Sequence, residues 1–166
     1  ASTAEDGTAI AAKVGEYAKL AIGPAGTEYV AFYDRAWGDL KVAMNTGSGW
    51  TVETVDSDGD VGQWPDVVIS GGTIYIAYHD VTNQNLKLAS GAPGAWTIET
   101  VDAGDYVGAD AAGLIRDGSP DIAYFDAVNS DVKLARRAGS WASSTIATDG
   151  ALGYHNEVVE AGGTAY

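Results

Sequence analysis

The sequence contains no cysteine, so disulfide bonds, zinc–thiolate sites and a thiol nucleophile are excluded. Basic residues are also scarce, because 9 Lys and Arg stand against 23 Asp and Glu and give a formal net charge of −14. An acidic surface repels phosphate backbones and anionic lipids, so we expect no nucleic-acid partner. No apolar run approaches the roughly 18 residues of a membrane-spanning helix, so we expect no membrane insertion, and no signal peptide is visible.

Residues of the usual catalytic sets are few as well. His79 and His155 are the only imidazoles, no Gly-x-Ser-x-Gly motif occurs, and no metal-ligand spacing is present. Phe and Met number only 2 and 1, whereas Gly numbers 22, Tyr 9 and Trp 5. Abundant glycine and aromatic residues are typical of short strands joined by tight turns. This composition remains compatible with cations and with neutral ligands such as sugars.

A repeat of about 46 residues dominates what is present. It is marked by an Asp, a Lys and a Trp in three copies and by a Gly in four: Asp34, Asp80 and Asp126; Lys41, Lys87 and Lys133; Trp50, Trp96 and Trp141; Gly15, Gly62, Gly108 and Gly153. In the second copy, runs of β-branched, aromatic and aliphatic residues at 65–70, 73–80, 86–89 and 96–101 are separated by turn residues. Four short strands in such a period indicate one blade of a β-propeller.

We therefore predict an all-β fold of propeller blades with four antiparallel strands each. The single array spans residues 1–166, with full blades at about 15–61, 62–107 and 108–152 and a partial blade at 153–166. Residues 1–14 are a possible closing strand. The fourth copy has an inner strand expected at 156–160 and stops inside its second strand. Open sheet faces need covers, so we expect further blades, from a longer chain or from other copies, and no soluble monomer.

The turn before the fourth strand ends in Gly and Trp in each copy, at 46–50, 91–96 and 137–141. Here the units resemble the Asp-box, or BNR, repeats of sialidase-type propellers, although all three turns lack the Asp of that box. They are also similar to repeats of secreted bacterial propellers that carry an aromatic–Asp pair, a Leu–Lys strand and a Trp–Thr strand. The resemblance covers residues 14–166. It implies a propeller fold, and it implies as one alternative that the chain is a fragment of a glycoside-processing enzyme.

One loop face of a propeller gathers the same position from every blade. We predict that this face holds Tyr17, Trp64, Asp110 and His155, which are equivalent in four copies, together with Trp37 from a neighbouring loop. Aromatic rings stack on the apolar faces of sugars, and carboxylates bond hydroxyl groups, so these five residues are our candidate ligand-binding residues. The alternative is that the aromatic residues only pack between blades.

Two sets of aspartates allow simpler interpretations. Asp34, Asp80 and Asp126 each precede a repeated Lys by 7 residues, so we predict that they cap a turn and pair with that Lys on the next strand. Asp56, Asp58 and Asp60 have the carboxylate density of a Ca²⁺ loop but lack the later Glu of an EF-hand. A calcium site and a solvated acidic turn both remain open there, and we expect no other cofactor.

Together these observations favour a non-catalytic binding or scaffold module that is extracellular or on the cell surface. Its aromatic loop face would bind glycans or a protein partner. Two alternatives remain: a fragment of a sialidase-like glycoside-processing enzyme, and a purely structural assembly subunit.

Overall fold

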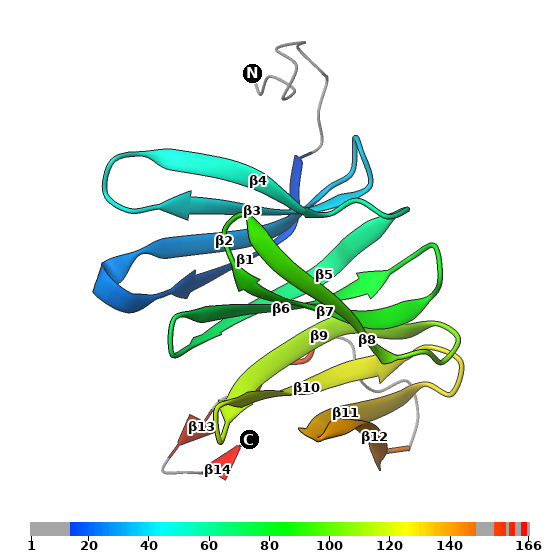
Figure 1. Ribbon diagram of the computed structural model, residues 1–166. Coiled ribbons are helices and arrows are strands. Elements are labelled where there is room, and N and C mark those ends of the chain that lie inside the picture. Colours follow the sequence, from blue (N-terminus) through cyan, green and yellow to red (C-terminus); the bar gives the residue numbers. More distant parts are fainter. Residues whose placement is uncertain (1–13, 149–154, 159, 162–163, 166) are drawn as a thin grey trace.

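The computed structural model describes residues 14–148, 155–158, 160–161 and 164–165 (Figure 1). Three four-stranded antiparallel sheets follow one another along the chain, and each keeps its strands in sequence order from the inside outward. The predicted all-β propeller-like fold is confirmed, and the three sheets form an open array. The described residues include one 3₁₀ turn, η1 (Pro24–Gly26), and no helix long and apolar enough to cross a membrane.

The sheets are called blades 1, 2 and 3. Blade 1 holds β1 (Val14–Ile22), β2 (Glu28–Asp34), β3 (Asp39–Asn45) and β4 (Trp50–Asp56). Blade 2 holds β5 (Val61–Ser70), β6 (Thr73–Asp80), β7 (Asn85–Ala92) and β8 (Ala95–Asp102). Blade 3 holds β9 (Val107–Arg116), β10 (Ser119–Asp126), β11 (Asp131–Ala138) and β12 (Ser140–Ala147). In blade 2, β6 has the bounds expected from the sequence, and the other three strands are longer than expected.

The hydrophobic core lies between the blades. One cluster joins blade 1 to blade 2, and a second joins blade 2 to blade 3. Ala31, Ala77 and Ala123 recur on the second strand of each blade and are 0%, 3% and 7% exposed. Ala31 and Ala77 belong to the first and the second cluster, so the next sheet covers this position in blades 1 and 2. Each fully buried Leu, Ile or Val in these clusters contributes roughly 1.5–3 kcal/mol.

A polar contact repeats at both joints between blades. Asp56, at the end of blade 1, accepts hydrogen bonds from the Tyr78 hydroxyl at 2.5 Å and from Lys87 Nζ at 2.7 Å, both in blade 2. Burial alone would raise the pKa of Asp56, but the bonds from Lys87 and Tyr78 hold it below its ordinary value. The same contact joins blades 2 and 3. We call these two sets the joint triads: Asp56, Tyr78 and Lys87, and Asp102, Tyr124 and Lys133.

The repeated aspartates at the ends of the second strands cap the following turns. Asp80 Oδ1 accepts the backbone N–H of Asn83 at 2.9 Å, and its Oδ2 lies 3.6 Å from Lys87 Nζ. The corresponding Asp–Lys distances are 3.4 Å in blade 1 and 3.9 Å in blade 3. Both the predicted turn cap and the predicted Lys pairing are confirmed. Asp34, Asp80 and Asp126 therefore have a structural role within each blade.

The described part of the fourth copy differs from the expected inner strand. A short hairpin pairs β13 (Glu160–Ala161) with β14 (Thr164–Ala165), in the register that Ser70 and Thr73 adopt in blade 2. Residues 155–158 are not in a strand, because they pair with no described strand. The expected closing strand at 1–14 falls almost entirely outside the described residues, as does Gly153.

Candidate ligand-binding site

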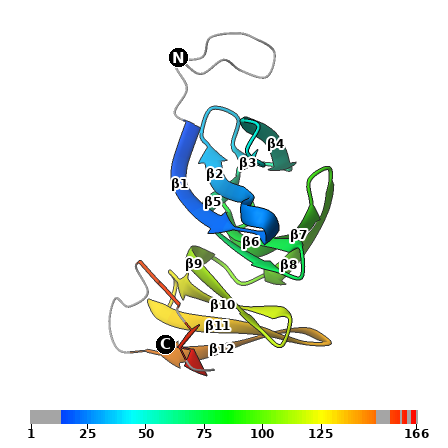
Figure 2. The same cartoon turned by 90° about the vertical axis from the view of Figure 1, so that its left-hand side faces the viewer.

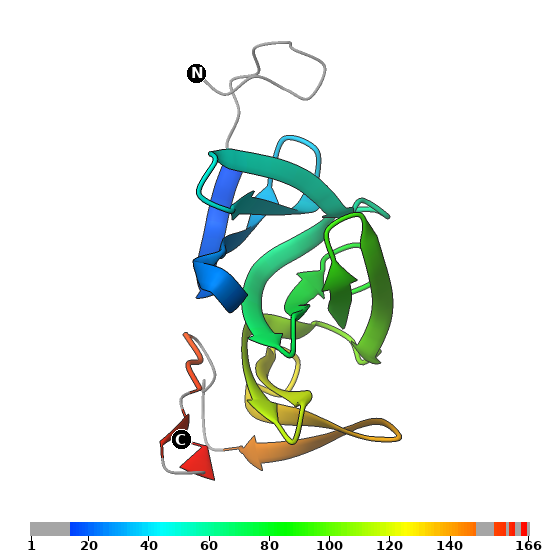
Figure 3. The same ribbon diagram turned by 60° about the vertical axis from the view of Figure 1, so that its left-hand side comes forward.

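Each blade begins with a bulge that turns one side chain inward. In β5 the pairing with β6 shifts by one residue between Gln63 and Asp66, so Trp64 and Pro65 lie opposite the single residue Tyr78. Equivalent shifts occur in β1 and β9. A bulge re-aims side chains and is common beside functional sites. The inner strands and the segment from residue 155 lie along the same side of the array (Figures 2 and 3).

The repeated glycine makes this bulge possible. Gly62 has a φ of +101°, and a Cβ built there would lie 2.6 Å from the Leu40 Cα of blade 1. Gly108 has a φ of +97°, and its Cβ would lie 2.8 Å from the Leu86 Cα. Only glycine fits both the left-handed conformation and the close approach of two backbones. The glycine therefore fixes where each inner strand meets the blade before it.

Two residues beyond this position, the backbone of all four copies adopts a left-handed conformation at a residue that carries a side chain. The φ values are 58°, 48°, 48° and 61° for Tyr17, Trp64, Asp110 and His155. This conformation costs roughly 1–2 kcal/mol for a residue other than glycine. Asp and His tolerate it better than Tyr and Trp do, so the strain is greatest at the two aromatic residues. Such strain persists where the surrounding structure fixes the backbone, and it is often found at ligand-binding sites.

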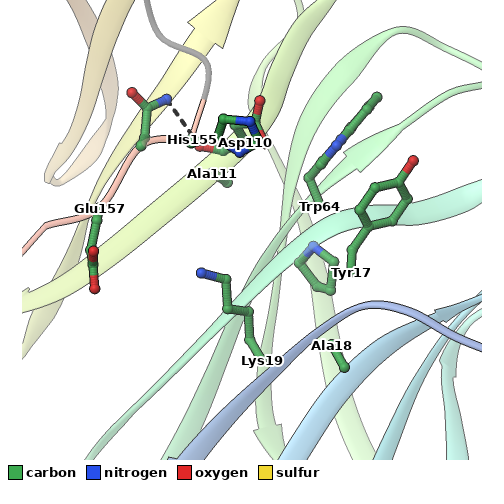
Figure 4. Close-up of a pocket in the computed structure, with 10 residues that line it drawn as sticks. Tyr17, Ala18, Lys19, Trp64, Asp110, Ala111, His155 and Glu157 are labelled. Atoms are coloured by element: carbon green, nitrogen blue, oxygen red, sulfur yellow. Dashed lines mark hydrogen bonds between the residues drawn. The ribbon is translucent and has the colours of Figure 1, made fainter.

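These four side chains line one cavity of about 380 Å³ (Figure 4). The sequence alignment of four copies thus identified residues that the fold brings together. The remaining lining residues are their close neighbours in sequence: Ala18, Lys19, Pro65, Ala111, Asn156 and Glu157. Trp37, the fifth candidate, lies in the turn between β2 and β3, is 57% exposed, and does not line this cavity.

One side of the cavity is aromatic. The Tyr17 and Trp64 ring centroids lie 5.1 Å apart with a 42° tilt, and the Trp64 ring lies 5.6 Å from the His79 ring. Tyr33 extends the cluster, with its centroid 6.4 Å from that of Tyr17, and its hydroxyl donates to Asp60 Oδ1 at 2.7 Å. The rings therefore pack across the joint between blades 1 and 2, and Tyr17 and Trp64 also line the cavity, where ligand binding stays a prediction.

The other side of the cavity is polar. Asp110, His155 and Glu157 line it, and Asn156 Nδ2 donates to the Asp110 carbonyl at 3.0 Å, which ties the segment at 155–158 to blade 3. Lys19 extends into the cavity from β1, on the opposite side from Glu157 (Figure 4). The site thus offers aromatic faces, two carboxylates, an amide, an imidazole and an ammonium group within one opening.

Lys19, Asn156 and Glu157 were not among the candidates chosen from the sequence. A signal for two of them was present, because Lys19 and Glu157 follow the aligned inward position by two residues, as Asp66 does in blade 2. Alternate residues of a strand share a face, so that position should also point inward. Lys19, Asp66 and Glu157 are three charged residues at one repeat position, and this recurrence was the signal for a second set of inward side chains.

The histidine and the aspartates outside the cavity have structural partners. His79 Nδ1 lies 2.7 Å from the Val107 carbonyl, to which its N–H donates, and burial lowers the pKa of His79 so that the neutral ring is favoured. Asp56 and Asp60 accept bonds from Tyr78 and Tyr33. Within the described parts of the chain, no group of three or more His, Asp or Glu residues is placed to hold a metal ion. The calcium alternative at Asp56, Asp58 and Asp60 stays a prediction.

No protein-family model matches this chain, and no curated protein matches it either. Among solved structures, the chain is similar to a leech intramolecular trans-sialidase complexed with 2,7-anhydro-Neu5Ac, with a TM-score of 0.55 and 15% identity. The match covers 85% of this chain and 26% of that chain. The likeness supports a sialidase-like β-propeller fold for this chain, which spans about a quarter of the length of the enzyme it matches.

Proposed function

We propose that this chain is a non-catalytic binding module that holds a sugar in the cavity between its inner strands. The observation that carries the proposal is the convergence of Tyr17, Trp64, Asp110 and His155 on one cavity, each in a left-handed conformation at an equivalent position. A sugar ring presents apolar C–H faces for Trp64 and Tyr17 and hydroxyl groups for Asp110 and Glu157. We also propose that the protein acts outside the cell, where glycans are displayed.

A glycan array with wild-type protein and two tryptophan variants tests this proposal. We expect Trp64→Ala to lower binding by about tenfold or more, because buried aromatic anchors carry much of the energy of a binding site. Trp50→Ala is the matched control, since Trp50 is 53% exposed at the start of β4 and does not line the cavity. Absence of any glycan signal, or equal losses in the two variants, would refute the assignment.

A second candidate function is a part of a sialidase-like glycoside-processing enzyme. The likeness to the trans-sialidase fold favours it, as do Asp110 and Glu157, two carboxylates in one cavity. Against it, the lining residues that the structure describes include no arginine to hold an acidic sugar, and Lys19 is the only Lys or Arg among them. A panel of chromogenic glycosides separates the candidates, because turnover that disappears in Glu157→Gln or Asp110→Asn would favour the enzyme.

We further propose that another blade of the same type covers the outer face of blade 1. Leu20 is 60% exposed there, whereas its equivalent Val67 in blade 2 is 5% exposed beneath blade 1. Trp50 is likewise exposed, whereas its equivalent Trp96 is half-buried and donates to Glu53 of blade 1 at 2.6 Å. Light scattering with intact mass measurement tests this proposal, because a stable monodisperse monomer of these 166 residues would contradict it.

A further inference from the structure

We propose that the cavity selects amino sugars, meaning hexoses with a protonated amine, over N-acetylated sugars and over sugars that carry a carboxylate. This inference rests on the proposed function and adds the chemical class of the ligand. It comes from the charges around the cavity and from the aromatic side of the same opening.

The charges that line the cavity are unbalanced. Asp110 and Glu157 supply two carboxylates, whereas Lys19 supplies one ammonium group. A third carboxylate, Asp66, lies on β5 two residues beyond Trp64 and accepts the Gly113 N–H at 2.6 Å. The whole chain, these residues included, has a formal net charge of −14. A cationic group in the cavity therefore meets an attractive field, and a second carboxylate meets a repulsive one.

Asp66 responds to the charges on both sides of the cavity. Burial raises the pKa of Asp66, the Gly113 N–H and the charge of Lys19 lower it, and the charge of Glu157 raises it further. Lys19 and Glu157 therefore act on a common space, as their positions across the opening indicate (Figure 4). Lys19 partly offsets the negative field, so its removal should strengthen the preference for a cation.

The aromatic rings favour the same class of ligand. A cation over the face of Trp or Tyr is attracted by the ring quadrupole, and Trp gives the strongest interaction. Trp64 and Tyr17 lie 5.1 Å apart on the side of the cavity opposite Glu157. An amino sugar placed between these rings and Glu157 presents a cation to both the rings and the carboxylates, which its N-acetylated counterpart cannot do.

The test compares glucosamine and galactosamine oligosaccharides with their fully N-acetylated counterparts and with an oligogalacturonate. Titration calorimetry is done at about pH 7, where carboxylates are ionised, an ordinary imidazole is mostly neutral and an amine is mostly protonated. We expect the amino oligosaccharide to bind about threefold to tenfold tighter than the N-acetylated form, and the acidic one to bind weakest. Raising the salt concentration should shrink this ratio, because the charges are partly exposed.

Three variants locate the effect within the cavity. Glu157→Gln should lower the ratio of amino to N-acetylated affinity by about threefold, and Lys19→Gln should raise it. Asp117→Asn is the control, because it removes one negative charge in the exposed turn between β9 and β10, and Asn tolerates the left-handed conformation that Asp117 has there. We expect the ratio to be unchanged in this variant.

The possible outcomes separate this inference from the proposed function. Equal or tighter binding of the N-acetylated or acidic oligosaccharides overturns the selectivity and leaves sugar binding intact. A shift in Asp117→Asn equal to that in Glu157→Gln also overturns it, because the preference would then come from the overall charge. If no glycan binds, on the array or in these titrations, both the inference and the proposed function fail.

Discussion

The joints between blades and the cavity between inner strands use the same repeat in opposite ways. Asp56, Tyr78 and Lys87 return as Asp102, Tyr124 and Lys133, so the joints keep both the backbone and the side chains. The inward position keeps only the backbone: the left-handed conformation recurs four times, with a different side chain each time. Constant side chains stabilise the array, and the variable side chains on a constant backbone form the surface that we propose for binding.

The comparison predicts that changes at the joints lower stability, whereas changes at the inward position lower binding. The largest effect is expected at a joint triad. Asp56→Ala leaves Lys87 and the Tyr78 hydroxyl buried without this partner and should lower the free energy of unfolding by about 3 kcal/mol. Urea unfolding followed by tryptophan fluorescence measures it. Asp58→Ala, on the same loop but exposed, should change it by less than about 0.5 kcal/mol.

The second prediction concerns Gly62, which contacts blade 1 and lies two residues before the inward position Trp64. Gly62→Ala should destabilise the protein by about 2–3 kcal/mol, because the added Cβ meets the Leu40 backbone at 2.6 Å and φ is +101°. Gly71 also has a positive φ, of 58°, but nothing lies within 4 Å of its Cβ position. Gly71→Ala should therefore cost only about 1 kcal/mol. Similar losses in the two variants would show that the contact with Leu40 contributes little.

The third prediction separates strain from binding at the inward position. In an ordinary strand, alanine is more stable than glycine by roughly 0.5–1 kcal/mol. At Trp64 the order should reverse, with Trp64→Gly about 1 kcal/mol more stable than Trp64→Ala, because φ is 48°. Both variants should lose sugar binding. Thr97, exposed on β8, is the control position where alanine should remain the more stable residue.

The sequence predicted the frame better than the site, for a physical reason. Repeated spacing and turn residues define blades, and four of the five candidate binding residues followed from aligning the copies. The bulge was not visible from the strand pattern, and a one-residue shift in the pairing of β5 reverses which face the residues on one side of it occupy. Lys19 and Glu157 were not predicted, although they follow the aligned inward position by two residues, as Asp66 does in blade 2. Trp37 does not line the cavity, because a loop on one face of a propeller is not thereby close to the central cavity.

The joint triads could not be predicted from spacing alone either. The Asp–Lys pair within one blade was visible, because both residues recur in each copy. The stronger contact is from Lys87 to Asp56 of the preceding blade, at 2.7 Å against 3.6 Å to Asp80. Which acid a lysine reaches depends on how two sheets stack, and a pattern within one repeat does not contain that information.

The smallest expected effect is the pH dependence of the joints, which has two separate windows. Asp56 and Asp102 have lowered pKa values in the folded state, so their stabilisation is present above their ordinary pKa and is lost as the pH falls below about 4. His79 also has a lowered pKa, but it is favoured as the neutral ring. The unfolded chain therefore takes up its proton first, and stability falls as the pH drops below about 6.5.

Only the upper window should disappear when His79 is replaced. We expect the free energy of unfolding of the wild type to fall by less than about 1.4 kcal/mol per pH unit between roughly pH 6.5 and 5. His79→Gln should show a flatter slope over this range, whatever its absolute stability, and should keep the steep loss below about pH 4. His155 remains in both proteins, so a difference in slope between them comes from position 79. An unchanged slope in His79→Gln would mean that the neutral ring at the joint of blades 2 and 3 is not held against protonation.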